Sequence, residues 1–176
     1  MITVMANAAG RAPAQQCDTT TGPIPPATAR RVRALILACS DPAAAEPLNV
    51  FLQNQHLTER CQLVHLPGGP LALATPDREA VLDECAMRVE SYRPRELMLV
   101  VHHDCERFGG SQTFPGRHAE ASSLENALAV AADIATRRFP GLQIRLARLD
   151  QRGTCSVTDH HPTPNDPTNG RDHQSC

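Results

Sequence analysis

The sequence predicts an α/β fold, a single domain with a mostly parallel central sheet of about four to five strands flanked by helices. Three observations lead to this prediction. Short apolar runs, typical of strands buried on both faces, alternate with segments of helical pattern. The order strand, helix, strand, helix, strand, helix, strand is typical of right-handed crossovers between parallel strands. The chain has 176 residues, 41% of them hydrophobic, which is enough for one domain around one core.

Four segments have the pattern of strands. Residues 33–39 and 96–102 are nearly continuous apolar runs, as expected of parallel strands that are covered on both faces. Residues 61–66 form a shorter run that ends at Pro67, Gly68 and Gly69. We expect these three residues to form a tight turn at the carboxyl edge of the sheet, near the candidate functional residues. In residues 142–149 the apolar side chains alternate, which indicates a fourth strand.

Three segments between these strands predict helices. Residues 42–55 have helical composition, with Pro47 in the first turn or at a kink. The second helix has Thr75 as its N-cap and ends at Arg93-Pro94, and the third covers residues 120–139. The apolar stripes are Val81, Leu82, Cys85 and Val89 in the second helix, and Leu124, Leu128, Ala131 and Ala135 in the third.

Composition divides the chain into three parts. Residues 1–29 are rich in Ala, Pro, Thr and Gln and cannot bury enough apolar surface to offset the entropy of ordering. We therefore expect a mobile N-terminal arm there. Residues 30–157 have the composition of a folded domain. Residues 158–176 are dense in Pro, Asn and Asp, which predicts a mobile polar tail.

Charge and cysteine usage exclude several classes of protein. The formal net charge is −2, from 17 arginines and no lysine against 19 acidic residues, which gives no electrostatic case for nucleic acid or an acidic membrane. No run approaches the ~18 consecutive apolar residues of a membrane span. The first residues lack the pattern of a secretory signal, so we expect a cytoplasmic protein. Its seven cysteines are then more often metal ligands, reactive groups or core residues than disulfides.

Metal-ligating residue types follow two of the predicted strands. Cys39 and Asp41 stand at the end of the first strand, and His102, His103 and Cys105 at the end of the third. Because ligands of open α/β sheets bind at the carboxyl ends of the strands, we expect these residues to share one site. Cys39, His102 and Cys105 form a Cys₂His set that suits Zn²⁺ and leaves the fourth position to water or a nearby carboxylate. Four other cysteines have no companion at ligand spacing, and we interpret them as structural or incidental: Cys17, Cys61, Cys85 and Cys155.

These motifs resemble those of the β-class carbonic anhydrases, which carry Cys-x-Asp-x-Arg after the first core strand and His-x-x-Cys after the third. The corresponding segments are Cys39-Ser40-Asp41-Pro42-Ala43 and His102-His103-Asp104-Cys105, with Leu66-Pro67-Gly68-Gly69 as the turn after the second strand. The resemblance covers about residues 33–150. It implies a carbonic anhydrase-type zinc lyase (carbonate dehydratase) that interconverts CO₂ and bicarbonate. It also implies Cys39, His102 and Cys105 as zinc ligands, Asp41 as the active-site aspartate, and a homodimer or a dimer of dimers.

The implied reaction is attack on CO₂ by a zinc-bound hydroxide, because zinc lowers the pKa of a bound water towards ~7. Asp41 would accept a hydrogen bond from the hydroxide and orient it. His103 is a candidate for the proton shuttle to solvent, since its unperturbed pKa of ~6.5 suits exchange near neutrality. A second interpretation makes His103 only a hydrogen-bonded neighbour of the site.

The chain departs from the family pattern at two places. Ala43 stands where the family has the arginine that pairs with the aspartate and keeps it off the metal. Asp41 is therefore free to become the fourth zinc ligand, to be held by another donor such as Arg107, or to serve only as a helix N-cap ahead of Pro42. The family's Cys-Gly-Gly is replaced by Cys105-Glu106-Arg107-Phe108-Gly109-Gly110.

Three alternative functions stay open at this point. A related zinc hydrolase would act on carbonyl sulfide or carbon disulfide. A non-catalytic zinc-binding or regulatory homologue would have its site closed by Asp41. In the third alternative, Cys39 is a redox-active or nucleophilic thiol ahead of a helix N-terminus, which would lower its pKa.

Overall fold

A computed structural model describes residues 31–152 and 155–160 of the chain. It contains a five-stranded sheet in the order β2-β1-β3-β4-β5. The first four strands are parallel, and β5 is antiparallel to β4. The strands are β1 (Ala34–Cys39), β2 (Cys61–Leu66), β3 (Glu96–His102), β4 (Gln143–Leu149) and β5 (Cys155–Asp159). The predicted α/β class with a mostly parallel sheet is confirmed.

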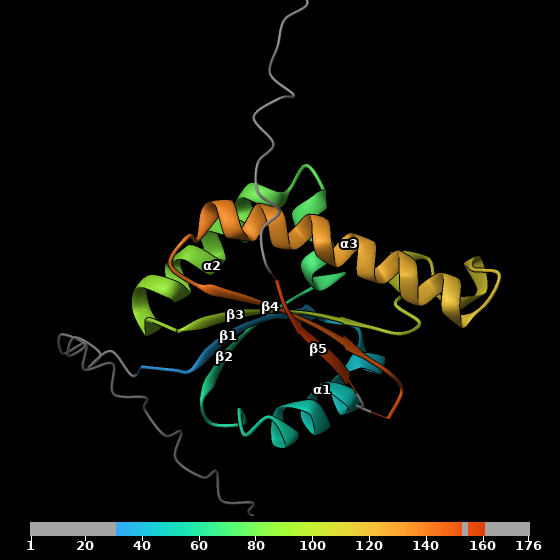
Figure 1. Ribbon diagram of the computed structural model, residues 1–176, viewed down its shortest axis with the longest axis horizontal. Helices are drawn as coiled ribbons and strands as arrows, with labels where there is room; N and C mark the ends of the chain where they lie inside the picture. The colour runs from blue at the N-terminus through green and yellow to red at the C-terminus, as the bar shows by residue number, and fades with distance from the viewer. Residues whose placement is uncertain (1–30, 153–154, 161–176) are drawn as a thin grey trace, which may run out of the picture.

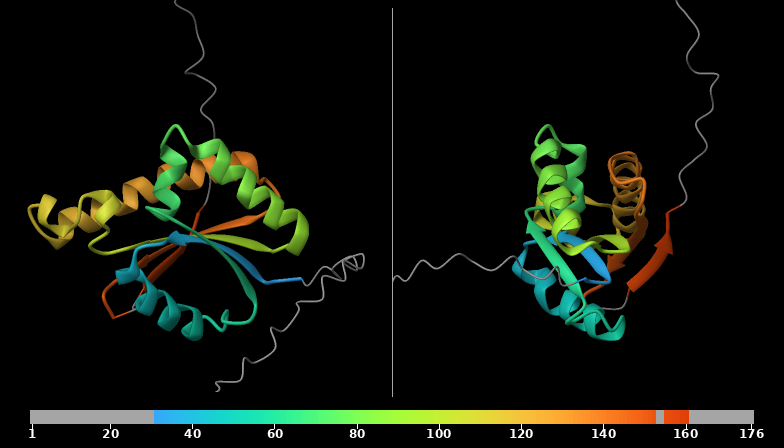
Figure 2. Two further views of the ribbon diagram at one scale, coloured as in Figure 1. Left: turned by 180° about the vertical axis from the view of Figure 1, so that it is seen from behind. Right: turned by 90° about the vertical axis from the view of Figure 1, so that its left-hand side faces the viewer.

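Three helices cover the sheet on both faces. They are α1 (Pro42–Asn54), α2 (Arg78–Tyr92) and α3 (Arg117–Arg138). Helix α1 lies on one face, whereas α2 and α3 lie side by side on the other (Figures 1 and 2). Three short 3₁₀ turns complete the described chain: η1 (Gly69–Ala74), η2 (Glu106–Phe108) and η3 (Ser111–Thr113). No helix in these residues is both long and apolar enough to cross a membrane.

Alternate residues of the central strands build a separate core on each face of the sheet. Leu35, Leu37 and their neighbours in β3 pack against α2 and α3, whereas Ile36 and Met98 pack against α1. Every residue of β1 and β3 is buried. This two-sided burial explains the nearly continuous apolar runs of these two strands in the sequence.

Strand β5 lies in a region where the sequence predicts no strand. Its last two residues, Thr158 and Asp159, fall in the segment predicted to be a mobile tail, so the folded part extends further than expected. The strand pairs along one edge of β4, and Val157 contributes to the α1-side core. A short edge strand that buries so little apolar surface leaves a weak pattern in the sequence. The predicted arm and residues 161–176 of the tail lie outside the described residues.

The connection between β2 and α2 also differs from the prediction. Residues 69–74 form η1, and the hydroxyl of Thr75 donates a hydrogen bond back to the carbonyl oxygen of Ala72 at 2.8 Å. Helix α2 therefore has Asp77, not Thr75, at its N-cap position. The threonine closes the preceding turn instead of opening the helix, a competing use of the same side chain.

Candidate metal centre

The carboxyl ends of β1 and β3 bring three soft donor side chains together. Cys39 is the last residue of β1 and His102 the last of β3, and the two strands are direct neighbours in the sheet. Cys105 follows three residues after His102. The Sγ atoms of the two cysteines and a ring nitrogen of His102 all lie within 4.8 Å of one another. All three side chains are buried, with exposed fractions of 5%, 4% and 3% for Cys39, His102 and Cys105.

The two sulfur atoms of this group have the spacing expected for a tetrahedral zinc ion. The two Sγ atoms are 3.9 Å apart, and Zn–S bonds of ~2.3 Å in a tetrahedron place two sulfurs about 3.8 Å apart. The Nδ1 atom of His102 lies 3.0 Å from the carbonyl oxygen of His103, which requires the ring proton to be on Nδ1. The Nε2 atom is then an unprotonated donor, and it is buried without a hydrogen-bond partner. A buried nitrogen lone pair beside two thiol sulfurs is the arrangement that a bound metal satisfies.

Hydrogen bonding prepares Cys39 to act as a thiolate. Its pKa falls to about 4 because the Cys105 thiol and the backbone N–H groups of Asp41 and Gly68 stabilise the anion, against the opposing effect of burial. The amide of Gly68 donates to Cys39 Sγ at 3.2 Å and that of Asp41 at 3.4 Å. The pKa of Cys105 is raised, because its proton is held against the Cys39 thiolate and the side chain is buried. One sulfur is thus charged before a metal binds.

The charge on Cys39 also affects His102. Burial alone would lower the pKa of this imidazole, but the adjacent Cys39 thiolate and the Asp41 carboxylate outweigh it and raise the pKa. A metal ion would replace the protons that this group holds, among them that of the Cys105 thiol, so binding of the metal should become tighter as pH rises.

Asp41 lies beside the three donors and caps α1. Its Oδ1 accepts the N–H of Ala43 at 2.9 Å, so the predicted N-cap role is confirmed. Its Oδ2 lies 3.5 Å from the amide nitrogen of Glu106 and 3.9 Å from His102 Nε2. None of the ion pairs among the described residues joins Arg107 to Asp41. Two backbone amides thus hold the carboxylate where the sequence lacks the family's arginine.

The turn after β2 forms the floor of the site. Gly68 has φ +79° and places its N–H against Cys39. Gly69 has φ +53°, and a Cβ atom on it would lie 2.6 Å from the backbone nitrogen of Cys39. The backbone of this turn packs so closely on the end of β1 that no side chain fits. The glycine pair is a tight turn near the site, as the sequence predicts.

His103 points to a different set of partners. Its Nε2 lies 2.8 Å from the Oε2 atom of Glu120, a buried residue in the first turn of α3. Glu120 also accepts hydrogen bonds from the backbone N–H of Asp104 and from the hydroxyl of Ser111, at 2.6 and 2.8 Å. His103 lines a cavity with Arg117 and residues 150–152, away from the three donors. This arrangement is that of the hydrogen-bonded neighbour considered in the sequence analysis.

Glu120 is the residue of this region that sequence reasoning missed. A carboxylate that is 2% exposed needs partners, and it finds them all in the loop that carries Cys105. The available signal was its spacing: Glu120 stands four and eight residues before Leu124 and Leu128, on the buried face of the helix. An acidic residue in line with an apolar stripe indicates a buried polar contact.

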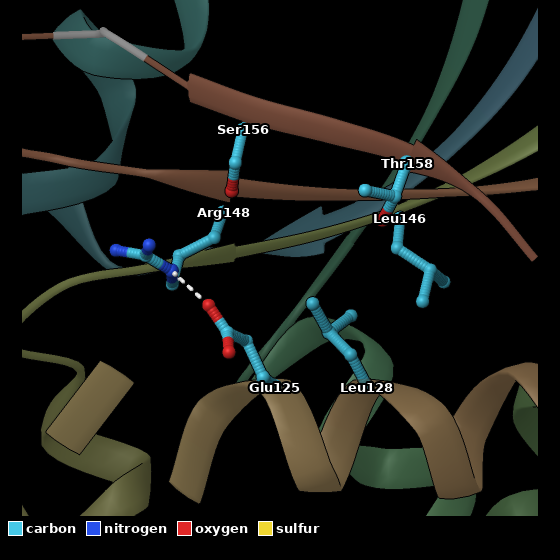
Figure 3. A pocket seen from close by; sticks show the side chains of 6 residues that line it. All are labelled: Glu125, Leu128, Leu146, Arg148, Ser156 and Thr158. Atoms are coloured by element: carbon cyan, nitrogen blue, oxygen red, sulfur yellow. Dashed lines mark hydrogen bonds and ion pairs between the residues drawn. The ribbon is translucent and has the colours of Figure 1, made fainter. Parts of the chain in front are cut away.

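Of the three donors, Cys39 lines a cavity of about 390 Å³. Its walls come from the ends of β1 and β2 and from η2, and they include Cys39, Asp41, Gly68, Glu106 and Arg107. A second cavity, of about 340 Å³, lies between α3 and strands β4 and β5 (Figure 3). There Arg148 pairs with Glu125 at 3.2 Å beside Leu128 and Leu146 (Figure 3), and none of the three donors lines this cavity.

Two other cysteines whose side chains are described, Cys61 and Cys85, do not join this group. Cys85 is buried in the α2-side core, where burial raises its pKa to about 12. Cys61 packs against the α1-side core, and burial raises its pKa as well. Both are free thiols, in agreement with their predicted structural role. Cys17 and Cys176 lie outside the described residues.

Comparisons with known proteins find structural likeness only. No protein-family model and no curated protein matches the chain. Among solved structures, the chain is similar to the β-carbonic anhydrase CafA of the fungal pathogen Aspergillus fumigatus, with 14% identity, a TM-score of 0.48, and 76% and 78% of the two chains covered. The β-carbonic anhydrase CcaA is 11% identical, with a TM-score of 0.44, and the match covers 77% of this chain and 80% of CcaA. Isoform I of the β-carbonic anhydrase from the protozoan Trichomonas vaginalis is 12% identical, with a TM-score of 0.47, and the match covers 75% of this chain and 84% of that one. All three bear the name of the family that the sequence motifs resemble.

Proposed function

We propose that this protein is a carbonic anhydrase-type zinc lyase that catalyses the reversible hydration of CO₂ to bicarbonate. The observation that carries the proposal is the three-donor group of Cys39, His102 and Cys105, with its unpartnered His102 Nε2. One of the three donors, Cys39, lines a cavity. Three protein donors leave one tetrahedral position for water or substrate, which is the pattern of catalytic rather than structural zinc. When bound, Zn²⁺ supplies a nucleophile near neutral pH by lowering the pKa of a water molecule.

The residues of the cavity suit a small linear substrate and an anionic product. The apolar part of the cavity wall, against which CO₂ would lie, is formed by Pro42, Pro67 and Gly68. The Asp41 carboxylate, held by the amides of Ala43 and Glu106, presents Oδ2 towards the donor group and can accept a proton from a bound nucleophile. Arg107 lines the same cavity and supplies positive charge for bicarbonate.

Stopped-flow CO₂ hydration on reduced, zinc-loaded protein tests the proposal. We expect activity that rises from about pH 7 to 9, because two thiolates reduce the acidifying effect of the metal on its water. Cys39→Ser should lose both stoichiometric zinc and hydration, whereas Cys61→Ser, a matched change outside the donor group, should keep both. A wild-type protein that holds zinc yet shows no hydration over this range would contradict the proposal, and carbonyl sulfide would then be assayed.

A second candidate, a non-catalytic zinc-binding protein, is supported by the 3.9 Å between Asp41 Oδ2 and His102 Nε2. A carboxylate so near the donor group could complete the coordination and close the site. Asp41→Asn distinguishes the two candidates, because asparagine keeps the helix cap while it removes the charge. We expect hydration to fall at least ten-fold with zinc content unchanged. A gain of hydration in this variant would instead show that Asp41 closes the site.

We also propose a homodimer or a dimer of dimers, as the sequence resemblance implies. Two surface features support an assembly. Strand β5 pairs only with β4 within the described residues, so its outer edge is open to another strand. Val130 on α3 is 51% exposed and lies on the helix that borders the cavity of Figure 3. Sedimentation equilibrium measures the mass directly, and a monomer at micromolar concentration would contradict this proposal.

A further inference from the structure

A cavity of about 870 Å³ lies at the end of the sheet opposite to the metal donors. It borders the amino ends of β1, β3 and β4, at the left of the sheet in Figure 1. Five arginines line it, against two glutamates: Arg31, Arg33, Arg60, Arg93 and Arg95. The whole chain has a net charge of −2, so this concentration of positive charge is a local feature of one surface.

Strand register places three of these arginines side by side. Arg60, Arg33 and Arg95 each stand one residue before β2, β1 and β3, whose first residues are paired in the sheet. The N–H of Arg33 donates to the carbonyl oxygen of Arg60 at 2.6 Å, and that of Arg95 donates to Arg33 at 3.0 Å. Neighbouring strands lie ~4.8 Å apart, and like charges in such positions destabilise a sheet. Negative charge close to this row of three arginines would reduce the repulsion between them.

Protein carboxylates neutralise only part of this charge. Glu96, whose side chain is 6% exposed, binds Arg33 through Oε1 at 3.1 Å and Arg145 through Oε2 at 3.3 Å. Each of its oxygens therefore already faces an arginine, although Oε1 accepts no hydrogen bond. The other carboxylate of the lining, Glu59, forms no ion pair within the described residues.

Four arginines of the cavity keep their charge unpaired. Across residues 31–152 and 155–160, no ion pair involves Arg31, Arg60, Arg93 or Arg95, and all four side chains are exposed. Arg93 ends α2 with its backbone in the left-handed conformation, with φ +47°. The site thus presents several guanidinium groups to solvent.

We propose that this cavity binds a small multivalent anion that carries phosphate or carboxylate groups. Guanidinium groups match both in a two-pronged geometry, and each such charged hydrogen bond is strong. The volume lies within the ~300–1,000 Å³ typical of small-molecule sites. The lining contains no aromatic side chain on which a base could stack, which argues against single-stranded nucleic acid. The inference does not depend on the proposed carbonic anhydrase activity.

Titration calorimetry on the full chain tests the proposal, with pyrophosphate and citrate as separate probes at constant ionic strength. We expect saturable binding of at least one of them, and their ranking shows whether the site favours phosphate or carboxylate. Arg60→Gln/Arg95→Gln should weaken binding by about ten-fold or more, because two guanidinium groups that form charged hydrogen bonds with the anion are lost. Arg78→Gln/Arg117→Gln removes the same charge outside the cavity and should bind as the wild type does.

Thermal stability without the anion gives a second readout. Arg60→Gln/Arg95→Gln should melt at a higher temperature than the wild type, because the repulsion within the row is relieved, and should lose the increase in melting temperature that the anion produces. Cys39→Ser should keep anion binding, which separates this site from the metal centre. The proposal is overturned if neither anion binds the wild type, if both arginine pairs weaken binding equally, or if only an oligonucleotide binds.

Discussion

The side chain of Asp41 both caps a helix and faces one of the three donor side chains. Its Oδ1 caps α1 through the N–H of Ala43, and its Oδ2 faces His102. The sequence predicted the residue and its capping, and it left open what holds the second carboxylate oxygen. In the structure the amide of Glu106, 65 positions further along the chain, donates to it at 3.5 Å. No local pattern could predict this contact, because it depends on how the loop after β3 folds over the end of β1.

At the same scale, Glu120 is predicted to support the metal centre. It holds the Cys105 loop through the N–H of Asp104, the hydroxyl of Ser111 and the ring of His103. Glu120→Gln removes the charge and weakens these contacts, so zinc affinity should fall ~10- to 100-fold, as is usual when a residue that orients the ligands is changed. Competition with a chromophoric chelator measures the affinity.

The matched control for this prediction is Glu125→Gln on the same helix. Glu125 is exposed and pairs with Arg148 at 3.2 Å, a surface ion pair that contributes less than about 1 kcal/mol. Its loss should leave zinc affinity within two-fold of the wild type. Equal affinities for the Glu120 variant and the wild type would show that the loop is held by other contacts.

At the scale of elements, the metal centre depends on how closely the turn after β2 approaches β1. The backbone at Gly68 and Gly69 lies directly against Cys39, and the amide of Gly68 donates to its sulfur. The sequence predicted a tight turn from the Pro-Gly-Gly pattern. It could not predict that this turn is also a hydrogen-bond donor to a ligand, since that requires β2 and β1 to be neighbours in register.

Gly69→Ala is predicted to damage both the fold and the centre. The new Cβ atom would lie 2.6 Å from Cys39 N and 2.7 Å from the carbonyl carbon of Ala38, at a φ of +53° that disfavours alanine. We expect a loss of about 3 kcal/mol in the free energy of unfolding, measured with urea, together with weaker zinc binding. Gly141→Ala is the control, because a Cβ there meets no atom within 4 Å. Similar stabilities for the two variants would refute the close approach.

Strand β5 is the element that local pattern did not predict. Its sequence, CSVTD, contains one branched apolar residue, Val157, and follows turn residues at 151 and 152. Pairing with β4 provides the hydrogen bonds that its composition does not suggest. Edge strands of this kind are stabilised by the neighbouring strand more than by their own propensity.

At the scale of the whole molecule, the stability of the metal-free protein should depend on pH through Cys39. An unfolded cysteine titrates near ~8.5, whereas Cys39 in the fold has a pKa of about 4. Between these values the unfolded chain binds more protons than the folded one, so this contribution to stability is full above ~8.5 and is lost as pH falls towards 4. The raised pKa of Cys105 acts in the opposite sense, and its contribution is lost only at higher pH.

Urea unfolding in the presence of a chelator, at pH 5, 7 and 8.5, measures this dependence. Cys39→Ser should be stabilised less than the wild type as pH rises across this range. Cys61→Ser is the control, because its thiol has a raised pKa and stays neutral, so it should keep the wild-type slope. Parallel curves for Cys39→Ser and the wild type would contradict a depressed pKa at Cys39.

The sequence by itself determined the fold class and singled out the three side chains that the fold brings together as a candidate metal site. Buried parallel strands require apolar runs, as in β1 and β3, and the residues that follow such strands reach the carboxyl edge of the sheet whatever the details of packing. The alternation of strands and helices then left few topologies. For these reasons Cys39, His102 and Cys105 could be named from their positions in the chain.

Only the tertiary structure decided how those donors are held and what lies at the other end of the sheet. The 3.9 Å between the two sulfurs, the amides that fix Asp41, and the contacts of Glu120 all join segments far apart in sequence. The row of Arg33, Arg60 and Arg95 likewise exists only because three strands share one register. Contacts of this kind depend on distances across the fold, and the periodicity of a chain reports only on its local burial.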